Sequence, residues 1–417
     1  YSSYTSLKLH IFWLDSELAM ETNSIHPLLI NCLLVFTFCS IVLLIGGPKC
    51  MVSSLEIIFT DPENDLTENV YNRFSENNMR IERSSHKENN ESDNVLDYPA
   101  GCPDNWSPCN CEKPSLWLSN LEVDCREVSG EDELSDVFRN AIYHDTHLHK
   151  FSLKGNPNIK VLHPGVFQHI VFDEIHIGYN NFERVELGAL DLMKSELNFI
   201  DFFRSNFHNL DDFPFNEIVT FDKLKKIDFG MNRFPAFPEI ASESLTWINF
   251  GLNPINSIEQ DVFRGLPRLK YINLAGTNLA QIYPGTFKGL PYLQEIDLTG
   301  NFFLELVAGS IITDSLKLSH LGLESNLISN VEQHSITFNP NMIVDLDSNP
   351  ISILHENVWR PLFEEGGTIW GNQLYLKCDC DLAWIVLNPM WLSNVTSARC
   401  TDGSSIANLD PSPFEDC

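Results

Sequence analysis

The sequence has few basic residues. It contains 27 Lys and Arg against 57 Asp and Glu among 417 residues, which gives a net charge of -30. Proteins that bind nucleic acid use Lys and Arg side chains to displace counterions from the phosphates, whereas acidic residues predominate in this chain. The composition therefore argues against nucleic-acid binding. The acidity favours solubility and leaves basic partners open.

The sequence also lacks the short motifs of common catalytic centres. It contains no H-E-x-x-H, no G-x-S-x-G, no phosphate-binding loop and no dinucleotide fingerprint. We therefore predict no catalytic residue, no cofactor and no enzyme activity. His147 and His149 would lie on one face of a strand, where they could form a metal-binding pair. Surface histidines without a ligand are commoner, so we predict no metal site.

What the sequence does contain is the hydrophobic pattern L-x-x-L-x-L-x-x-N-x-L, repeated about every 24 residues from Leu148 to about Leu362. We number its places from the first Leu. The copies, called repeats 1 to 9, begin at Leu148, Phe172, Leu197, Leu224, Leu245, Leu269, Leu293, Leu318 and, in a degenerate form, near Asn341. The ninth place holds Asn156, Asn180, Asn232, Asn253, Asn301, Asn326 and Asn349, with Ser205 and Thr277 in the other two repeats. Inward asparagines there can hydrogen-bond the backbone of neighbouring turns.

This period and internal spacing are the signature of a leucine-rich-repeat solenoid. We predict an α/β repeat fold with a curved parallel sheet of about nine repeats over residues 148–370. A second hydrophobic series should face the convex half of the solenoid. It comprises Phe167, Phe263, Phe287, Ile311, Ile336 and Trp359.

Eight of the eleven cysteines flank the repeats. Cys102, Cys109, Cys111 and Cys125 precede them, and Cys378, Cys380, Cys400 and Cys417 follow them. A solenoid exposes its core at both ends unless caps cover it. We therefore predict disulfide-stapled caps at 102–147 and 371–417 in an oxidising compartment. Each cluster allows three connectivities, and zinc bound by the C-x-C pairs is the competing interpretation.

The amino-terminal part contains an apolar run at 27–47 and then an acidic, polar stretch. We predict a signal peptide or signal anchor at 20–50, preceded by a possible upstream non-native extension at 1–19. Residues 51–101 should form an acidic disordered linker. A cleaved signal gives a secreted protein, and an uncleaved run gives a single-pass protein at the cell surface. Sequons at Asn90, Asn105 and Asn394 predict glycosylation.

The concave face is the candidate binding surface, because a solenoid presents it to partners. Outward residues at the third place include Phe199, Trp247 and Tyr271, and aromatic residues are enriched in binding hot spots. The fifth place adds an acidic and amide row of Asp201, Asp228, Asn249, Asn273 and Asp297. Small residues at the seventh place (Gly230, Gly251, Ala275) should let a partner approach closely. We predict partner binding by these third-place and fifth-place residues.

Two segments carry a family resemblance that covers about 101–417. Cys-Pro-Asp-Asn-Trp-Ser-Pro-Cys-Asn-Cys at 102–111 resembles the amino-terminal cap of extracellular leucine-rich-repeat proteins. Leu-Lys-Cys-Asp-Cys-Asp-Leu-Ala-Trp-Ile-Val at 376–386 resembles their carboxy-terminal cap. The later Asn388-Pro-Met-Trp and Cys400-Thr-Asp-Gly-Ser resemble arthropod relatives of the non-catalytic subunit of Oplophorus-luciferin 2-monooxygenase. The resemblance implies bridges Cys102–Cys111, Cys109–Cys125, Cys378–Cys400 and Cys380–Cys417, and a role beside a separate catalytic chain.

Together these features predict a secreted, non-catalytic binding protein or accessory subunit. Its partner would be another protein, either a separate catalytic subunit or a receptor or ligand. The alternative is a membrane-anchored recognition or adhesion receptor with the same ectodomain. The membrane is a partner only if the run at 27–47 stays uncleaved.

Overall fold

The computed structural model describes residues 102–113 and 121–417. The predictions for 1–19, 20–50 and 51–101, including the sequon at Asn90, lie outside the described residues. The chain divides into two compact units, Tyr1–Asp93 and Asn94–Cys417, and the described residues all belong to the second. Among them, no helix combines the length and the apolar character needed to cross a bilayer.

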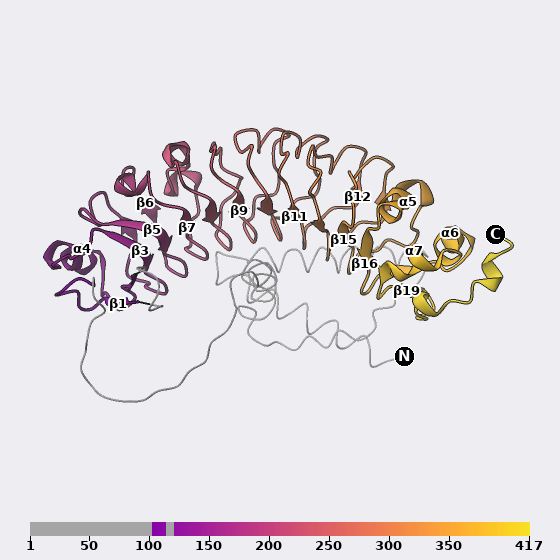
Figure 1. Cartoon of the computed structure of the whole chain (residues 1–417), viewed down its shortest axis with the longest axis horizontal. Coiled ribbons are helices and arrows are strands. Elements are labelled where there is room, and N and C mark those ends of the chain that lie inside the picture. The colour runs from indigo at the N-terminus through magenta and orange to yellow at the C-terminus, as the bar shows by residue number, and fades with distance from the viewer. Residues whose placement is uncertain (1–101, 114–120) are drawn as a thin grey trace, which may run out of the picture. The chain divides into compact units, whose positions relative to one another are not determined.

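One long curved sheet runs through the described unit (Figure 1). Its 13 strands are parallel except for the antiparallel pair at the amino-terminal edge, β1 with β2. Nine of the strands come from repeats 1 to 9, so the predicted solenoid is confirmed. In spatial order the strands are β1 (Asn110–Glu112), β2 (Glu122–Asp124), β3 (His147–Ser152), β5 (Val171–His176), β7 (Phe199–Asp201), β8 (Lys226–Asp228), β9 (Trp247–Asn249), β10 (Tyr271–Asn273), β11 (Glu295–Asp297), β13 (His320–Gly322), β15 (Ile343–Asp345), β16 (Thr368–Trp370) and β18 (Val395–Thr396).

Most of these strands are three residues long, and their length follows from the repeat pattern. The fourth-place residue, such as Ile248 or Ile272, points inward and is fully buried, whereas its two neighbours face the concave side. The eighth-place residue of every repeat then adopts a left-handed backbone conformation that turns the chain away from the sheet. Its φ lies between 52° and 75° at Gly155, Tyr179, Arg204, Met231, Leu252, Gly276, Gly300, Ser325 and Ser348.

The ninth-place asparagines connect neighbouring turns, as their inward position predicts. Asn253 is 1% exposed, and its amide donates hydrogen bonds to the carbonyl oxygens of Phe229 and Phe250, both at 2.9 Å. Its own oxygen accepts from the Phe234 N–H at 3.0 Å. The side chain thereby satisfies backbone groups of two repeats that have no water to bind. Thr277 has one hydroxyl in place of an amide, and its donor reaches the Leu274 carbonyl.

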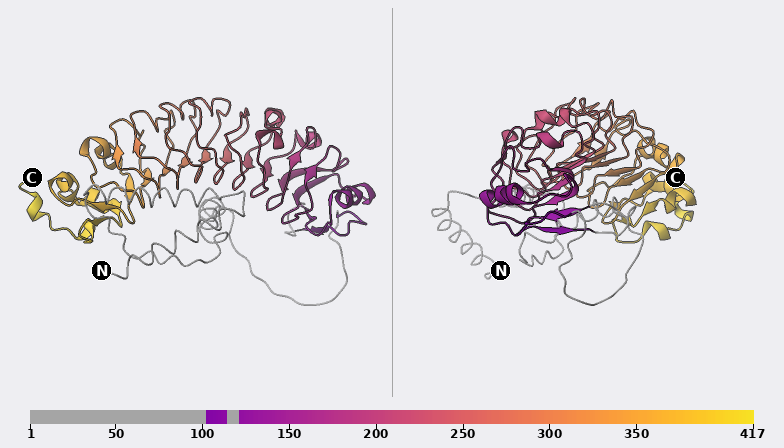
Figure 2. Two further views of the ribbon diagram at one scale, coloured as in Figure 1. Left: turned by 180° about the vertical axis from the view of Figure 1, so that it is seen from behind. Right: turned by 60° about the vertical axis from the view of Figure 1, so that its left-hand side comes forward.

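The convex half consists of turns, short helices and two-stranded ribbons (Figure 2). The predicted hydrophobic series there is buried, and Phe263 stacks on Phe287 with ring centroids 5.8 Å apart. The ribbons pair β4 (Val161–Leu162) with β6 (Arg184–Val185) and β12 (Glu305–Leu306) with β14 (Asn330–Val331). The 3-10 helices of the repeats are η1 (Asp191–Met193), η2 (Leu210–Asp212) and η3 (Phe215–Thr220).

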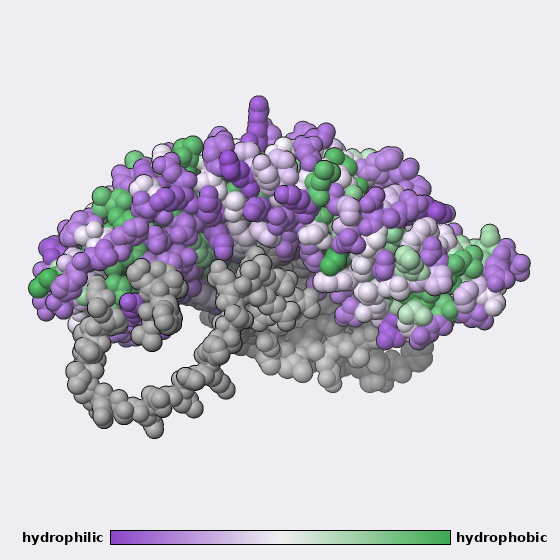
Figure 3. All heavy atoms as spheres, in the orientation of Figure 1, coloured by the Kyte–Doolittle hydropathy of each residue, from purple (hydrophilic) through white to green (hydrophobic). Residues whose placement is uncertain are grey.

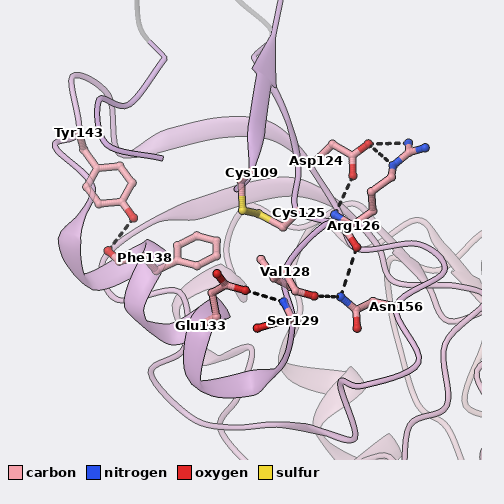
Figure 4. Close-up of a disulfide and its surroundings, with 10 residues drawn as sticks. All are labelled: Cys109, Asp124, Cys125, Arg126, Val128, Ser129, Glu133, Phe138, Tyr143 and Asn156. Atoms are coloured by element: carbon pink, nitrogen blue, oxygen red, sulfur yellow. Dashed lines mark hydrogen bonds and ion pairs between the residues drawn. A yellow bond between two sulfur atoms is a disulfide. The ribbon is translucent and has the colours of Figure 1, made fainter. Parts of the chain in front are cut away.

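The amino-terminal cap closes repeat 1 with a helix and two disulfides. Helix α4 (Glu131–Asn140) buries Leu134, Val137 and Phe138, and the Glu133 carboxylate accepts from the Ser129 N–H ahead of the helix (Figure 4). Spacing of three and four residues puts the buried side chains on one helix face. The Phe138 ring contacts Phe151, Phe167 and Phe172 of the first repeats. Strand β2 continues the parallel sheet into the cap, which the repeat pattern had not predicted.

The carboxy-terminal cap follows β16 and also extends the sheet, through β18. Around them lie α5 (Glu356–Glu364), α6 (Ala383–Val386), α7 (Pro389–Ser393), the ribbon of β17 (Tyr375–Leu376) with β19 (Arg399–Cys400), and the 3-10 helices η4 (Cys380–Leu382), η5 (Ile406–Asn408) and η6 (Ser412–Phe414). The Trp384 indole N–H donates to the Leu354 carbonyl at 3.1 Å, and its ring contacts Phe363 and Trp391. These aromatic contacts cover the end of the hydrophobic core.

Four disulfides staple the caps, Cys102–Cys111, Cys109–Cys125, Cys378–Cys400 and Cys380–Cys417. This is the pairing that the family resemblance implies. The sulfur atoms are therefore consumed in bridges, and the alternative of zinc bound by the C-x-C pairs falls away.

Candidate functional site

The concave face carries two rows of side chains that run across the strands. The third-place row contains Lys150, Glu174, Phe199, Lys226, Trp247, Tyr271, Glu295, His320 and Ile343, and strand pairing sets neighbouring members directly opposite one another. Phe199, Trp247 and Tyr271 are half-buried. A partner would meet this row first.

The fifth-place row is tied to the protein's own backbone. In repeats 3 to 7, the side-chain oxygen of the fifth-place Asp or Asn accepts from the N–H two residues further on, at 2.8–3.0 Å. The pairs are Asp201 with Phe203, Asp228 with Gly230, Asn249 with Gly251, Asn273 with Ala275, and Asp297 with Thr299. Such Asx turns stabilise the chain where it leaves the strand. Asp201, Asp228, Asn249 and Asn273 are only 3–4% exposed. These side chains therefore stabilise the local backbone and expose little surface for a partner to contact.

The small residues at the seventh place accommodate these buried side chains. A Cβ added to Gly230 would lie 2.7 Å from the Asn249 amide nitrogen, and one added to Gly251 would lie 2.8 Å from the Asn273 oxygen. The space that we expected a partner to use is occupied by the next repeat's fifth-place residue. Packing between repeats explains the small residues without a partner.

A charged network occupies the amino-terminal part of the concave face. The Asp201 carboxylate lies 3.0 Å from the Lys154 ammonium and 3.2 Å from His176 Nδ1, and His176 Nε2 lies 2.9 Å from Glu174. Burial alone would lower the pKa of His176, but the two carboxylates outweigh it and raise that pKa. Sequence reasoning missed this network. Its members stand in the third and fifth places of repeats 2 and 3, apart from Lys154 in the seventh place of repeat 1.

Asp228 behaves differently from Asp201, its neighbour in the same row. Burial and the nearby Asp201 charge raise the pKa of Asp228 well above its usual range. In contrast, His176 and Lys154 overcome burial and hold the pKa of Asp201 low. The Asn249 amide donates to Asp228 at 2.9 Å. Of the two adjacent carboxyl groups, Asp201 therefore favours the ionised form and Asp228 the protonated form.

Aromatic side chains form the middle of the third-place row. The Phe199 ring contacts His176 edge-on at 4.9 Å and Trp247 at 6.4 Å, and the Lys226 ammonium lies 6.0 Å from the Phe199 centroid. The Tyr271 hydroxyl donates to Gln294 at 2.7 Å. Trp247 and Tyr271 occupy paired positions of β9 and β10, as the sequence predicted. This segment offers apolar ring surface flanked by a cation.

The next members of the row carry less charge than their residue types suggest. Burial, with help from Asp297, raises the pKa of Glu295 to about 7. Burial also lowers the pKa of His320, whose ring lies 5.4 Å from that of Trp370. Near neutral pH, the row from Trp247 to Ile343 therefore carries only the partial negative charge of Glu295.

The side of the solenoid that is seen in Figure 3 provides a contrast. Its hydrophobic residues form separate small patches among polar ones. The two predicted glycosylation sites among the described residues differ: Asn105 is exposed, whereas Asn394 is half-buried and its amide donates to the Gly367 carbonyl at 3.1 Å.

The chain was compared with known proteins. A family model described as leucine rich repeat matches residues 243–303. The non-catalytic subunit of Oplophorus-luciferin 2-monooxygenase from Oplophorus gracilirostris is 26% identical over 318 residues, which is 75% of this chain and 87% of that protein. The chain thus has a leucine-rich-repeat fold and resembles this subunit.

Solved structures also resemble it. An octameric complex of Latrophilin 3, Unc5D and FLRT2 (LRR) contains a chain with a TM-score of 0.51 and 15% identity, matched over 75% of this chain and 99% of that one. This likeness concerns the fold. A TLR13–ssRNA13 complex gives a TM-score of 0.40 at 21% identity, with 60% of this chain covering 30% of the TLR13 chain.

Proposed function

We propose that this chain is a secreted, non-catalytic binding protein that holds a protein partner on its concave face. The observation that carries the proposal is the third-place row, in which Phe199, Trp247 and Tyr271 stand on a preformed sheet. A rigid sheet costs little ordering entropy on binding, and half-buried aromatic residues supply large contact areas.

The relative supports the accessory role. It is named a non-catalytic subunit, so a separate catalytic chain is one class of partner for this protein, and a receptor or ligand is the other. Disulfides at both caps support an oxidising, extracellular location. The Asp and Asn side chains of the fifth place hydrogen-bond their own backbone and so stabilise the strands that carry the third-place row. The partner's main contacts therefore fall on the third place.

The binding test uses Trp247→Ala and Tyr271→Ala. Each should weaken partner binding by about 1–3 kcal/mol, because truncating a hot-spot aromatic residue removes contacts at the centre of an interface. The purified mature chain serves as bait on extract of its source tissue. Proteins retained by the bait are identified and produced, and their affinities for each variant are measured by surface plasmon resonance.

Tyr283→Ala is the matched control. Tyr283 is 41% exposed, and it lies in the loop between β10 and β11, outside the third-place row. A true concave-face partner keeps its affinity for this variant and loses it for the other two. Equal binding to all variants, with the fold intact by circular dichroism, would remove the concave face from the proposal.

Sequencing the amino terminus of the natural product decides between secretion and the membrane-anchored alternative. A new terminus between about 40 and 60 on protein recovered from medium supports secretion. A membrane-bound product that keeps residues 27–47 would favour a receptor ectodomain instead. Turnover by the purified chain that is lost on mutating one polar residue would contradict the non-catalytic role.

A further inference from the structure

Side chains of metal-binding type from the segments of three neighbouring strands, β3, β5 and β7, converge at the edge of the sheet where these strands begin. His147 starts β3, Asp173 lies in β5, and Glu196 precedes β7. One nitrogen or oxygen from each lies within 4.8 Å of the others, and this is the one such group found among the described residues. Strands β3, β5 and β7 are parallel neighbours in the sheet, so the spacing of parallel strands brings the three side chains together.

From this convergence we infer that His147, Asp173 and Glu196 bind one divalent transition-metal ion of the zinc type. Imidazole nitrogen and carboxylate oxygen are zinc ligands, with bonds of about 2.0–2.2 Å. The side chains are partly exposed, so each has room to move the short distance needed to contact a shared ion. The presence of histidine favours zinc, cobalt or nickel over calcium, which prefers ligands that are all oxygen.

Each carboxylate of the group has a supporting contact. Asp173 places one oxygen 2.7 Å from His147 Nε2 and the other 3.2 Å from His149 Nδ1. The Lys223 ammonium donates to Glu196 at 2.6 Å. Outer contacts of this kind orient metal ligands and are usually costly to remove. His149 therefore acts as a positioning residue for Asp173.

The site goes beyond the pair that the sequence offered. His147 and His149 alone are two residues of one strand, whereas the carboxylates come from positions 26 and 49 residues later in the chain. With three protein ligands, the ion keeps at least one position for water or for a donor from a partner. It would also link the segments of strands β3, β5 and β7 across the sheet edge.

His163 provides a matched control. It also lies between two carboxylates of neighbouring segments, but its Nδ1 faces Glu186 at 3.0 Å and its Nε2 faces Glu131 at 3.6 Å. The two nitrogens are on opposite sides of the ring, so the carboxylates on either side cannot share one ion with it. His163→Ala should leave metal binding unchanged.

The experiment titrates the full mature chain, without a histidine tag, with Co²⁺ and follows the visible absorption bands of bound cobalt. Zn²⁺ then competes for the site in a calorimeter. We expect one equivalent of cobalt in the wild type and in His163→Ala, and none at this site in His147→Ala or Glu196→Gln. His149→Ala should bind about 10–100-fold more weakly.

Two outcomes would contradict the proposed metal site. If wild type and His147→Ala take up the same cobalt with the same spectrum, the ion binds elsewhere and the assignment is wrong. If His163→Ala loses as much binding as His147→Ala, binding reflects general surface histidines. Circular dichroism of each variant keeps loss of fold distinct from loss of metal. The result does not depend on whether the concave row binds a protein.

Discussion

At the scale of single residues, Glu295 shows how the concave face controls charge. It stands between Tyr271 of β10 and His320 of β13, with Asp297 on its own strand. The two neighbouring side chains bring no formal cation near neutral pH, since burial lowers the pKa of His320. Burial and the Asp297 carboxyl raise the pKa of Glu295 to about 7. A proton on Glu295 is therefore favoured in the folded state.

This shift predicts a pH dependence of stability. The folded state holds the Glu295 proton up to about pH 7, whereas the unfolded chain releases it near pH 4.5, the ordinary value. The free energy of unfolding therefore decreases as the pH rises through that window, by at most about 3 kcal/mol. The decrease is complete above the pKa of Glu295 in the folded state. Glu295→Gln should match wild type near pH 4.5 and exceed its melting temperature at pH 8.

Calorimetry of both proteins at pH 4.5, 6 and 8 checks the prediction. The difference between wild type and variant isolates Glu295 from other shifted groups such as Asp228 and His176. Glu305→Gln, at an exposed glutamate in β12 of repeat 7, serves as the control. A constant difference across the pH range would contradict the raised pKa.

At the scale of the element, stacked phenylalanines join repeats 3, 4 and 5. The sixth-place rings of Phe202, Phe229 and Phe250 lie 5.8 and 5.6 Å apart with interplanar angles of 8° and 21°. Phe213 and Phe215, from the longer loop of repeat 3, pack edge-on against Phe229 at 4.8 and 5.0 Å. One ring thus contacts residues of three consecutive repeats.

Phe229→Ala should lower the free energy of unfolding by about 3–5 kcal/mol, because a fully buried ring leaves a cavity that its neighbours fill incompletely. Phe302→Ala, at a phenylalanine that is 41% exposed, should change it much less. Urea denaturation measures both. Similar losses in the two variants would contradict the prediction, because the exposed Phe302 ring leaves no buried cavity.

The elements also show how far the sequence determines the site. The repeat places predicted the strand registers, the inward asparagines and the alignment of Trp247 with Tyr271, because period-2 alternation fixes which side chains point outward. The left-handed eighth place was not predictable from residue type, since it holds Met231 and Leu252 as well as glycines. Sequence also could not show that Asp228 and Asn249 fold back onto their own backbone, because strand alternation gives a side chain's direction and says nothing of its hydrogen bonds.

At the scale of the molecule, the described unit is a one-dimensional stack whose ends are closed by caps. The predicted caps at 102–147 and 371–417 contain the disulfides, yet strands β2 and β18 continue the repeat sheet into them, whereas β16 ends the predicted repeat range at Trp370. The sequence missed the two cap strands because cap segments replace the repeat's leucines with other residues, such as Cys125. Each repeat contacts its neighbours, so the loss of one cap should act locally at first.

The double variant Cys109→Ser with Cys125→Ser tests that expectation. The bridge closes a segment with a sequence separation of 16, and its loss should cost about 3 kcal/mol through the entropy of the unfolded chain. Hydrogen exchange should accelerate in β2 and β3 and stay unchanged in β13 and β15, because only neighbouring repeats share contacts. Cys380→Ser with Cys417→Ser should give the mirror result, with faster exchange in β16 and β18. Uniform acceleration along the whole sheet in either variant would show that the solenoid unfolds as one cooperative unit, and the caps would then stabilise every repeat equally.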